Sequence, residues 1–223
     1  MIQQIPFDLA GSPSFARDDL VATPANSTAI DFVDNWPDWP HPIVALVGPV
    51  GSGKSHIAGA WMALSGAHPA KMGTLPKKVS SPVLLEDVER ATLLDEDLFH
   101  LINAVREAGE TLLMTARTWP RAWGVGLADL QSRLRAATVV ELFEPDDMLL
   151  EGVLLKLMAD RQMTIDAQTI RYLVTHMERS LASAGALVEA LDRNALALKR
   201  PVTRRLAGEV LGALQNNAVN QQS

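Results

Sequence analysis

The sequence predicts an α/β fold: a parallel sheet with flanking helices, followed by a smaller domain built only of helices. Three observations predict it. A glycine-rich loop joins an apolar run to a helix, apolar runs then alternate with amphipathic segments, and beyond Pro145 only helical patterns follow. We therefore expect an N-terminal arm over residues 1–18, an α/β domain over 19–144 and a helical domain over 145–223.

Short apolar runs mark the strands of the α/β domain. The expected strands are residues 43–47, 83–85, 111–115 and 138–142, and any strand within 66–82 is minor. The first is apolar throughout, as is typical of a strand covered on both faces. The expected helices are residues 27–33, 54–65, 95–108 and 129–135. In the second of these, Ile57, Trp61 and Leu64 are spaced to form one buried stripe.

The chain beyond Pro145 has a helical pattern with short connections. The expected helices are residues 146–160, 166–177, 180–199 and 203–214. Asp146, Asp166 and Thr203 stand at helix starts, where a side-chain oxygen can accept a hydrogen bond from a free backbone N–H group. These features predict a small helical bundle.

The composition excludes several classes of protein. The chain has no cysteine, which excludes disulfides and thiolate metal sites, and it carries a net charge of −6, opposite to the usual charge of a DNA-binding domain. No apolar run approaches the roughly 18 residues of a membrane span, and the N-terminus lacks the pattern of a secretory signal. We expect a cytoplasmic protein with no membrane contact and no direct sequence-specific DNA binding.

A phosphate-binding loop is the strongest motif. Residues 48–55 fit the pattern G-x-x-x-x-G-K-[ST] between an apolar run and a helix. In this pattern, glycines let backbone N–H groups point at phosphate oxygens, Lys54 reaches the β- and γ-phosphates, and the Ser55 hydroxyl binds Mg²⁺. The alternative is a glycine-rich turn that matches by chance. The predicted nucleotide-contacting residues are Gly48, Pro49, Val50, Gly51, Ser52, Gly53, Lys54, Ser55 and His56.

Two carboxylates follow the second strand. Glu86 and Asp87, with Ser55, are the predicted magnesium ligands, although an acidic strand end is also ordinary in α/β proteins. The first acid of such a pair is usually aspartate. The extra methylene of Glu86 moves its carboxylate outward by about 1.5 Å, and an error of about 1 Å can cost 10²-fold in rate. Weak intrinsic hydrolysis is therefore expected, which leaves open whether the chain is itself an enzyme.

The order of the motifs resembles the AAA+ family of the bacterial replication initiator DnaA, and more closely the shorter regulators of the Hda type. The motifs are Gly53-Lys54-Ser55-His56, LLED, LLMTARTWPRAW and ADLQSRL, followed by a helical lid. The resemblance runs from Gln4 to about Leu211. It implies a P-loop AAA+ core that binds ADP or ATP with Mg²⁺. Only about ten residues follow the last expected helix, so we expect no DNA-reading domain like that of an initiator.

The resemblance also assigns roles to single residues. Arg133 matches an arginine finger that acts on a neighbour's nucleotide, although it could also be an ordinary surface arginine. Thr115 matches a polar sensor on the third strand, and Val21 and Pro24 match a linker that covers adenine. Two positions depart from the family. Arg117 replaces an acidic residue, and Ala182 stands where the lid should present an arginine, with Arg179 one turn earlier.

The N-terminal arm resembles a clamp-binding peptide. Gln4, Ile5, Phe7 and Leu9 match the short glutamine-led segment by which Hda-type regulators bind the DNA polymerase sliding clamp (its β subunit). Pro6 favours an extended backbone, so the apolar side chains can enter a groove. The alternative is an arm packed on its own domain.

These inferences give one main hypothesis and two alternatives. The main hypothesis is a negative regulator of replication initiation that docks on the DNA-loaded clamp and stimulates hydrolysis of ATP bound to DnaA through Arg133. One alternative is an autonomous AAA+ ATPase that acts as a helicase or transposition loader. The other is a degenerate module that no longer binds nucleotide. The sequence leaves homo-oligomerisation open.

Overall fold

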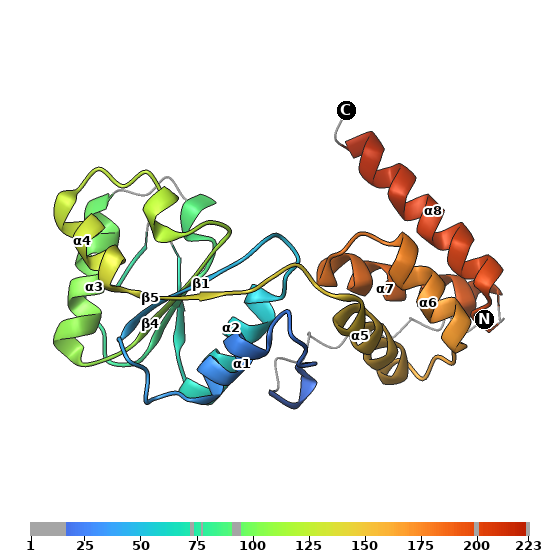
Figure 1. Ribbon diagram of the computed structural model, residues 1–223, viewed down its shortest axis with the longest axis horizontal. Helices are drawn as coiled ribbons and strands as arrows, with labels where there is room; N and C mark the ends of the chain where they lie inside the picture. Colours follow the sequence, from blue (N-terminus) through green and yellow to red (C-terminus); the bar gives the residue numbers. More distant parts are fainter. Residues whose placement is uncertain (1–16, 72–73, 77, 91–94, 199–200, 222–223) are drawn as a thin grey trace, which may run out of the picture.

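The computed structural model describes residues 17–71, 74–76, 78–90, 95–198 and 201–221, which form a sheet domain and a helical domain (Figure 1). The sheet has five parallel strands in the order β2-β3-β4-β1-β5. The strands are β1 (Ile43–Val47), β2 (His68–Ala70), β3 (Val83–Leu85), β4 (Leu112–Ala116) and β5 (Thr138–Glu141). Strand β1 pairs with the central strand β4 on one side and with the edge strand β5 on the other, so its carboxyl end lies between theirs.

Helices cover both faces of the sheet. They are α1 (Ser27–Asp34), α2 (Lys54–Ser65), α3 (Asp95–Ala108) and α4 (Ala128–Ala136), with short 3-10 turns η1 (Arg17–Asp19), η2 (Val88–Arg90) and η3 (Pro120–Ala122). Ile43, Ala45 and Val47 pack with α3 and α4, whereas Val44 and Leu46 pack with α1 and α2. All five residues of β1 are buried, as the unbroken apolar run predicted.

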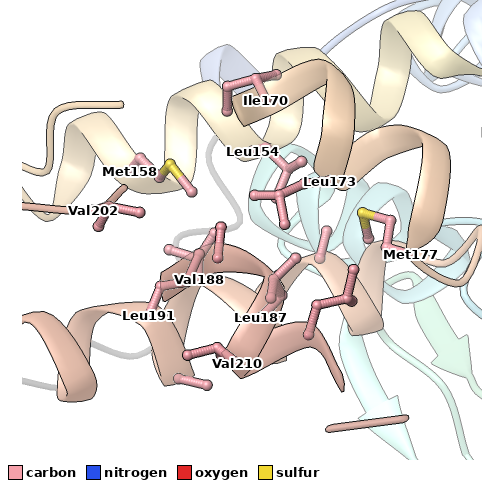
Figure 2. Close-up of a cluster of buried hydrophobic side chains, with 14 of the residues drawn as sticks. Leu154, Met158, Ile170, Leu173, Met177, Leu187, Val188, Leu191, Val202 and Val210 are labelled. Atoms are coloured by element: carbon pink, nitrogen blue, oxygen red, sulfur yellow. The ribbon is translucent and has the colours of Figure 1, made fainter. Parts of the chain in front are cut away.

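Four helices form the lid, as the sequence predicted. They are α5 (Asp147–Asp160), α6 (Ala167–His176), α7 (Leu181–Leu198) and α8 (Arg204–Gln221). Their apolar faces meet in a separate core, in which Leu154, Leu173 and Leu187 are almost fully buried (Figure 2). Because this core is distinct from the two cores of the sheet domain, the lid buries apolar side chains of its own.

Most element boundaries agree with the expected ones within two residues, and two expectations need correction. The last helix runs to Gln221, well past the expected end at residue 214. Leu64 is 54% exposed, although its spacing placed it on the buried stripe of α2. The fully buried part of α2 ends at Trp61 and Met62 is only partly buried, so the core does not extend to Leu64.

The cap of α6 gives a first testable prediction. The Asp166 carboxylate accepts hydrogen bonds from the backbone N–H groups of Gln168 and Thr169 and from the Thr169 hydroxyl at 2.6 Å. These bonds, above all that from the hydroxyl, hold the pKa of Asp166 below its ordinary value. A depressed carboxyl pKa adds stability above the unfolded-state pKa of about 3.9, and this contribution disappears as pH falls through the lower folded-state value. Asp166→Asn should therefore lower the urea midpoint at pH 7 and flatten its fall towards pH 2.5, measured by circular dichroism. Equal acid slopes in both proteins would contradict the assignment.

Candidate functional site

The glycine-rich loop joins β1 to α2 at the carboxyl edge of the sheet. Gly51 has φ of 76° and Gly53, the residue before α2, has φ of 99°. Residues with a Cβ atom rarely adopt this left-handed region, so the turn depends on glycine at both positions. The loop thus brings the first turn of α2, with its unpaired N–H groups, next to β1.

Two buried polar side chains in the loop fit a phosphate ligand. The Lys54 ammonium is buried and donates to the carbonyl oxygens of Gly48 and Pro49, each at 2.8 Å. Burial lowers the pKa of Lys54, while Glu89 and Asp87 act in the opposite direction. Ser52 is 2% exposed, and its hydroxyl oxygen has no hydrogen-bond partner among the described residues. A buried polar atom without a partner is costly, so a bound ligand that accepted a hydrogen bond from this hydroxyl would be stabilised.

A pocket of ≈ 420 Å³ opens in front of this loop. It is lined by Val50, Gly51, Gly53, Lys54, Ser55, His56, Asp87, Arg117, Leu181 and Ala182. Six of the nine predicted loop residues therefore line one pocket. Gly48 is buried behind the loop, Pro49 is exposed and contributes its carbonyl to Lys54, and Ser52 lines a neighbouring pocket.

Two of the three predicted magnesium ligands line this pocket and the third does not. Ser55 and Asp87 line it, whereas Glu86 is exposed and is not among its lining residues. The described residues contain no group of three or more His, Cys, Asp or Glu side chains that could hold a metal alone. Magnesium is commonly held by one or two carboxylates together with substrate phosphates, so Ser55 and Asp87 fit a nucleotide-dependent ion.

Thr115 connects two strand ends at this edge. It is buried in β4, and its hydroxyl accepts a hydrogen bond from the backbone N–H of Asp87 at 3.0 Å. Asp87 itself has φ of 52°, an unusual conformation for a residue with a side chain. The contact holds the chain after β3 in a turn beside the phosphate pocket, and Thr115, the predicted sensor, is not itself among the residues that line either pocket.

Glu89 is a residue that the sequence reading missed. One of its carboxylate oxygens accepts a hydrogen bond from the Arg117 backbone N–H at 2.9 Å and lies 3.7 Å from Arg117 Nε. The other oxygen is buried without a partner among the described residues. Because η2 turns the chain directly after Asp87, Glu89 returns to the same edge of the sheet, and no sequence motif indicated that return.

A second pocket of ≈ 250 Å³ adjoins the first and is mainly apolar. Val21, Ile57, Leu149, Val153 and Leu157 supply its walls, and Asn26 and Asp19 lie at its margin. An apolar slot with a few polar groups suits a nucleobase. Of the two residues that the resemblance assigned to the adenine linker, Val21 lines this pocket, whereas Pro24 is exposed and is not among the lining residues.

The lid closes over both pockets. The first backbone N–H of α7, from Leu181, donates to the Gly51 carbonyl at 2.8 Å, and Ser180 is buried against the same glycine. On the other side, the Lys156 ammonium of α5 lies 2.6 Å from a carboxylate oxygen of Asp19. The candidate nucleotide site is therefore built from both domains, because the loop comes from one domain and its cover comes from the other.

Arg133 lies outside this site. It is on α4, at the end of the sheet domain away from the lid (Figure 1), and it does not line either pocket. Its guanidinium carbon lies 4.7 Å from the centre of the Phe99 ring on α3, a cation–π contact. The predicted clamp-binding residues Gln4, Ile5, Phe7 and Leu9 lie outside the described part of the chain.

Comparison with known proteins identifies the fold and the lid. A model of the Hda lid domain matches residues 151–211. Domain III of the Thermotoga maritima replication initiation protein DnaA has the same fold, with a TM-score of 0.77, 16% identity and coverage of 91% of this chain and 97% of that one. The chain therefore has a DnaA-like AAA+ fold with a lid that matches the Hda lid domain. The α/β fold with a helical lid, inferred from the sequence, is thereby confirmed.

Two further proteins are similar to this chain. An uncharacterised protein of Haemophilus influenzae is 27% identical over 195 residues, which cover 79% of this chain and 84% of that protein. DnaA from Aquifex aeolicus, solved with bound AMPPCP, is 17% identical with a TM-score of 0.66, over 83% of this chain and 66% of that one. Within the described residues, no helix is both long and apolar enough to cross a membrane.

Proposed function

We propose that this DnaA-related protein is a replication regulator. It binds an adenine nucleotide as a structural ligand and stimulates hydrolysis of ATP held by the initiator DnaA. The Hda-type lid and the DnaA-like fold support a DnaA-related replication regulator. The further steps, in which Arg133 acts on the initiator and the N-terminal arm binds the sliding clamp, are our proposal.

The position of Arg133 carries this proposal. The chain's own phosphate pocket lies under the lid, whereas Arg133 lies on α4 at the other end of the sheet domain (Figure 1). An arginine so placed cannot reach the nucleotide of its own chain, but it can enter the site of a second AAA+ protein docked on that face. A guanidinium at a γ-phosphate stabilises charge that develops during hydrolysis, by roughly 10³- to 10⁵-fold in rate in other NTPases.

The chain's own site is suited to holding a nucleotide rather than to rapid turnover. Lys54, Ser55 and Asp87 line the phosphate pocket, but Glu86 does not. On the lid side, the pocket is lined by Ala182, whose methyl group offers a phosphate neither a positive charge nor a hydrogen-bond donor. In the proposed mechanism, bound ADP or ATP fixes the lid against the loop and so fixes the surface that the initiator meets.

The deciding experiment measures hydrolysis of radiolabelled ATP pre-bound to DnaA from the same organism. We expect this protein to accelerate hydrolysis in the presence of clamp loaded on DNA, while it hydrolyses little ATP alone. Substantial turnover without any partner would favour the autonomous ATPase instead. Absence of acceleration, with folded protein and loaded clamp, would contradict the regulator.

Clamp docking is tested in the same assay. Gln4→Ala combined with Phe7→Ala should remove most of the clamp-dependent acceleration, because the hydrogen-bonding and aromatic anchors of the proposed peptide are lost together. Asp8→Asn, within the same segment, is the matched control and should retain activity. If the doubly substituted protein still binds clamp and still responds to it, the proposed docking step is contradicted. That result leaves the proposed action of Arg133 untouched.

A further inference from the structure

The two pockets under the lid indicate how a nucleotide lies in the site. We call the pocket of ≈ 420 Å³ the phosphate pocket and the apolar pocket of ≈ 250 Å³ the base pocket. They share Gly53, His56 and Leu181, so they are continuous at those residues. The apolar pocket is suited to the base, and the phosphate loop follows it. Asp87 and Arg117, from the ends of β3 and β4, line only the phosphate pocket. A nucleotide whose base fills the apolar pocket therefore extends its phosphates into the pocket that these two residues line.

Among the described residues of the lid, those that line the phosphate pocket carry no positive charge. Ala182 is the residue of α7 that lines the phosphate pocket without also lining the base pocket. Arg179, one turn earlier, donates to Asp147 at 2.7 Å and to the Pro145 carbonyl at 2.8 Å. Its guanidinium thus ties α7 to the start of α5, and Arg179 is not among the residues that line either pocket.

Arg117 brings a second positive charge to the pocket from the opposite wall. It lines the pocket with Lys54 and is close enough to lower the pKa of that lysine. Its Nε lies 3.7 Å from the Glu89 carboxylate, which is beyond hydrogen-bond distance but close enough for attraction between opposite charges. Within the described part of the chain, its side chain donates no hydrogen bond, and it is 40% exposed. Glu89 therefore holds the Arg117 side chain at the pocket. The N–H groups of the Arg117 guanidinium remain able to bind a phosphate.

We propose that Arg117, positioned by Glu89, replaces the missing lid arginine and binds the γ-phosphate of ATP. This inference rests on the proposed nucleotide site and deepens it, because it names the residue by which the protein distinguishes ATP from ADP. Arginine suits this role because its planar fork can donate two parallel hydrogen bonds to one phosphate. A cation supplied from β4 also acts without movement of the lid, so the triphosphate is recognised by the sheet domain itself.

The test is direct binding of Mg²⁺-ADP and of Mg²⁺-AMPPCP, a non-hydrolysable ATP analogue, to the purified chain by calorimetry. Arg117→Ala should weaken AMPPCP binding by roughly 10- to 100-fold, the range for loss of a charge-assisted hydrogen bond, and should change ADP binding far less. Arg121→Ala is the matched control, because it removes the same charge from an exposed residue outside both nucleotide pockets. It should leave the ratio of the two affinities unchanged.

A rescue variant separates phosphate binding from a structural effect. Adding Ala182→Arg to Arg117→Ala places a guanidinium on the opposite wall of the same pocket and should restore part of the AMPPCP affinity. Equal loss of both nucleotides in Arg117→Ala, or no loss of either, would overturn the inference. A wild-type chain that binds neither nucleotide would instead contradict the nucleotide site of the proposed function. Because the initiator is absent from this binding assay, its result does not depend on Arg133, which is tested by hydrolysis on the initiator.

Discussion

Arg133→Ala should reduce the stimulated hydrolysis of initiator-bound ATP by roughly 10³-fold or more, the effect of losing an arginine finger in other NTPases. The variant should remain folded, since Arg133 makes a half-buried contact with the face of Phe99 and a cation–π contact of this kind contributes only about 0.5–1 kcal/mol. The measurement is single-turnover hydrolysis on the initiator with loaded clamp. Thermal unfolding of the isolated variant should change by only a few degrees.

Two further variants show whether the effect belongs to this one guanidinium. Arg135→Ala removes an exposed arginine from the same helix, whose Nε donates to the Gln131 carbonyl, and should leave stimulation intact. Arg133→Lys keeps the charge but loses the planar fork, so it should recover only a small part of the rate. If Arg133→Ala stimulates as well as the wild type, the finger lies elsewhere. A defect of equal size in Arg135→Ala would point to the whole face of α4 as a docking surface.

The parts of the molecule that depend on local pattern could be predicted from the sequence. The glycine positions of the phosphate loop, the apolar run of β1 and the caps at Asp146 and Asp166 each express a constraint carried by neighbouring residues. The helical lid followed in the same way, because a capping residue precedes the helical pattern in three of its four helices. Leu64 shows the limit of this reasoning: helical spacing places it on a face, but the extent of the surrounding fold decides whether that face is covered.

Contacts between residues that are far apart in the sequence could not be predicted. Glu89 reaches Arg117 across 28 positions because η2 reverses the chain after β3, and the sequence contains no pattern for that contact. The same holds for Leu181, whose backbone N–H meets the carbonyl of Gly51 although 130 residues separate them. Val21 and Pro24 were both assigned to the linker by resemblance, yet only Val21 lines the base pocket.

This contact between lid and loop leads to a prediction about Gly51. Its φ of 76° disfavours any side chain, and a Cβ atom there would lie 2.1 Å from Ser180 Oγ and 3.0 Å from Ser180 Cα. Gly51→Ala must therefore strain the loop and push back the start of α7, which breaks the bond from Leu181 to the loop. We expect a loss of stability of about 2–5 kcal/mol, from left-handed strain of about 1–2 and overpacking of about 1–3. Nucleotide affinity should fall at least about tenfold, since an error of about 1 Å in a binding group has effects of this size.

Gly66→Ala is the control that isolates the contact from the backbone strain. Gly66 has φ of 68°, close to that of Gly51, but a Cβ atom there would meet nothing within 4 Å. This variant should lose only the strain energy, about 1–2 kcal/mol, and keep its nucleotide affinity. Adding Ser180→Gly to Gly51→Ala removes the two closest atoms at little cost to the helix start and should restore part of the affinity. Equal urea midpoints and equal nucleotide affinities for the Gly51 and Gly66 variants would mean that the lid does not rest on the loop in solution. A larger loss at Gly51, relieved by Ser180→Gly, would mean that closure of the lid and formation of the phosphate site are a single event.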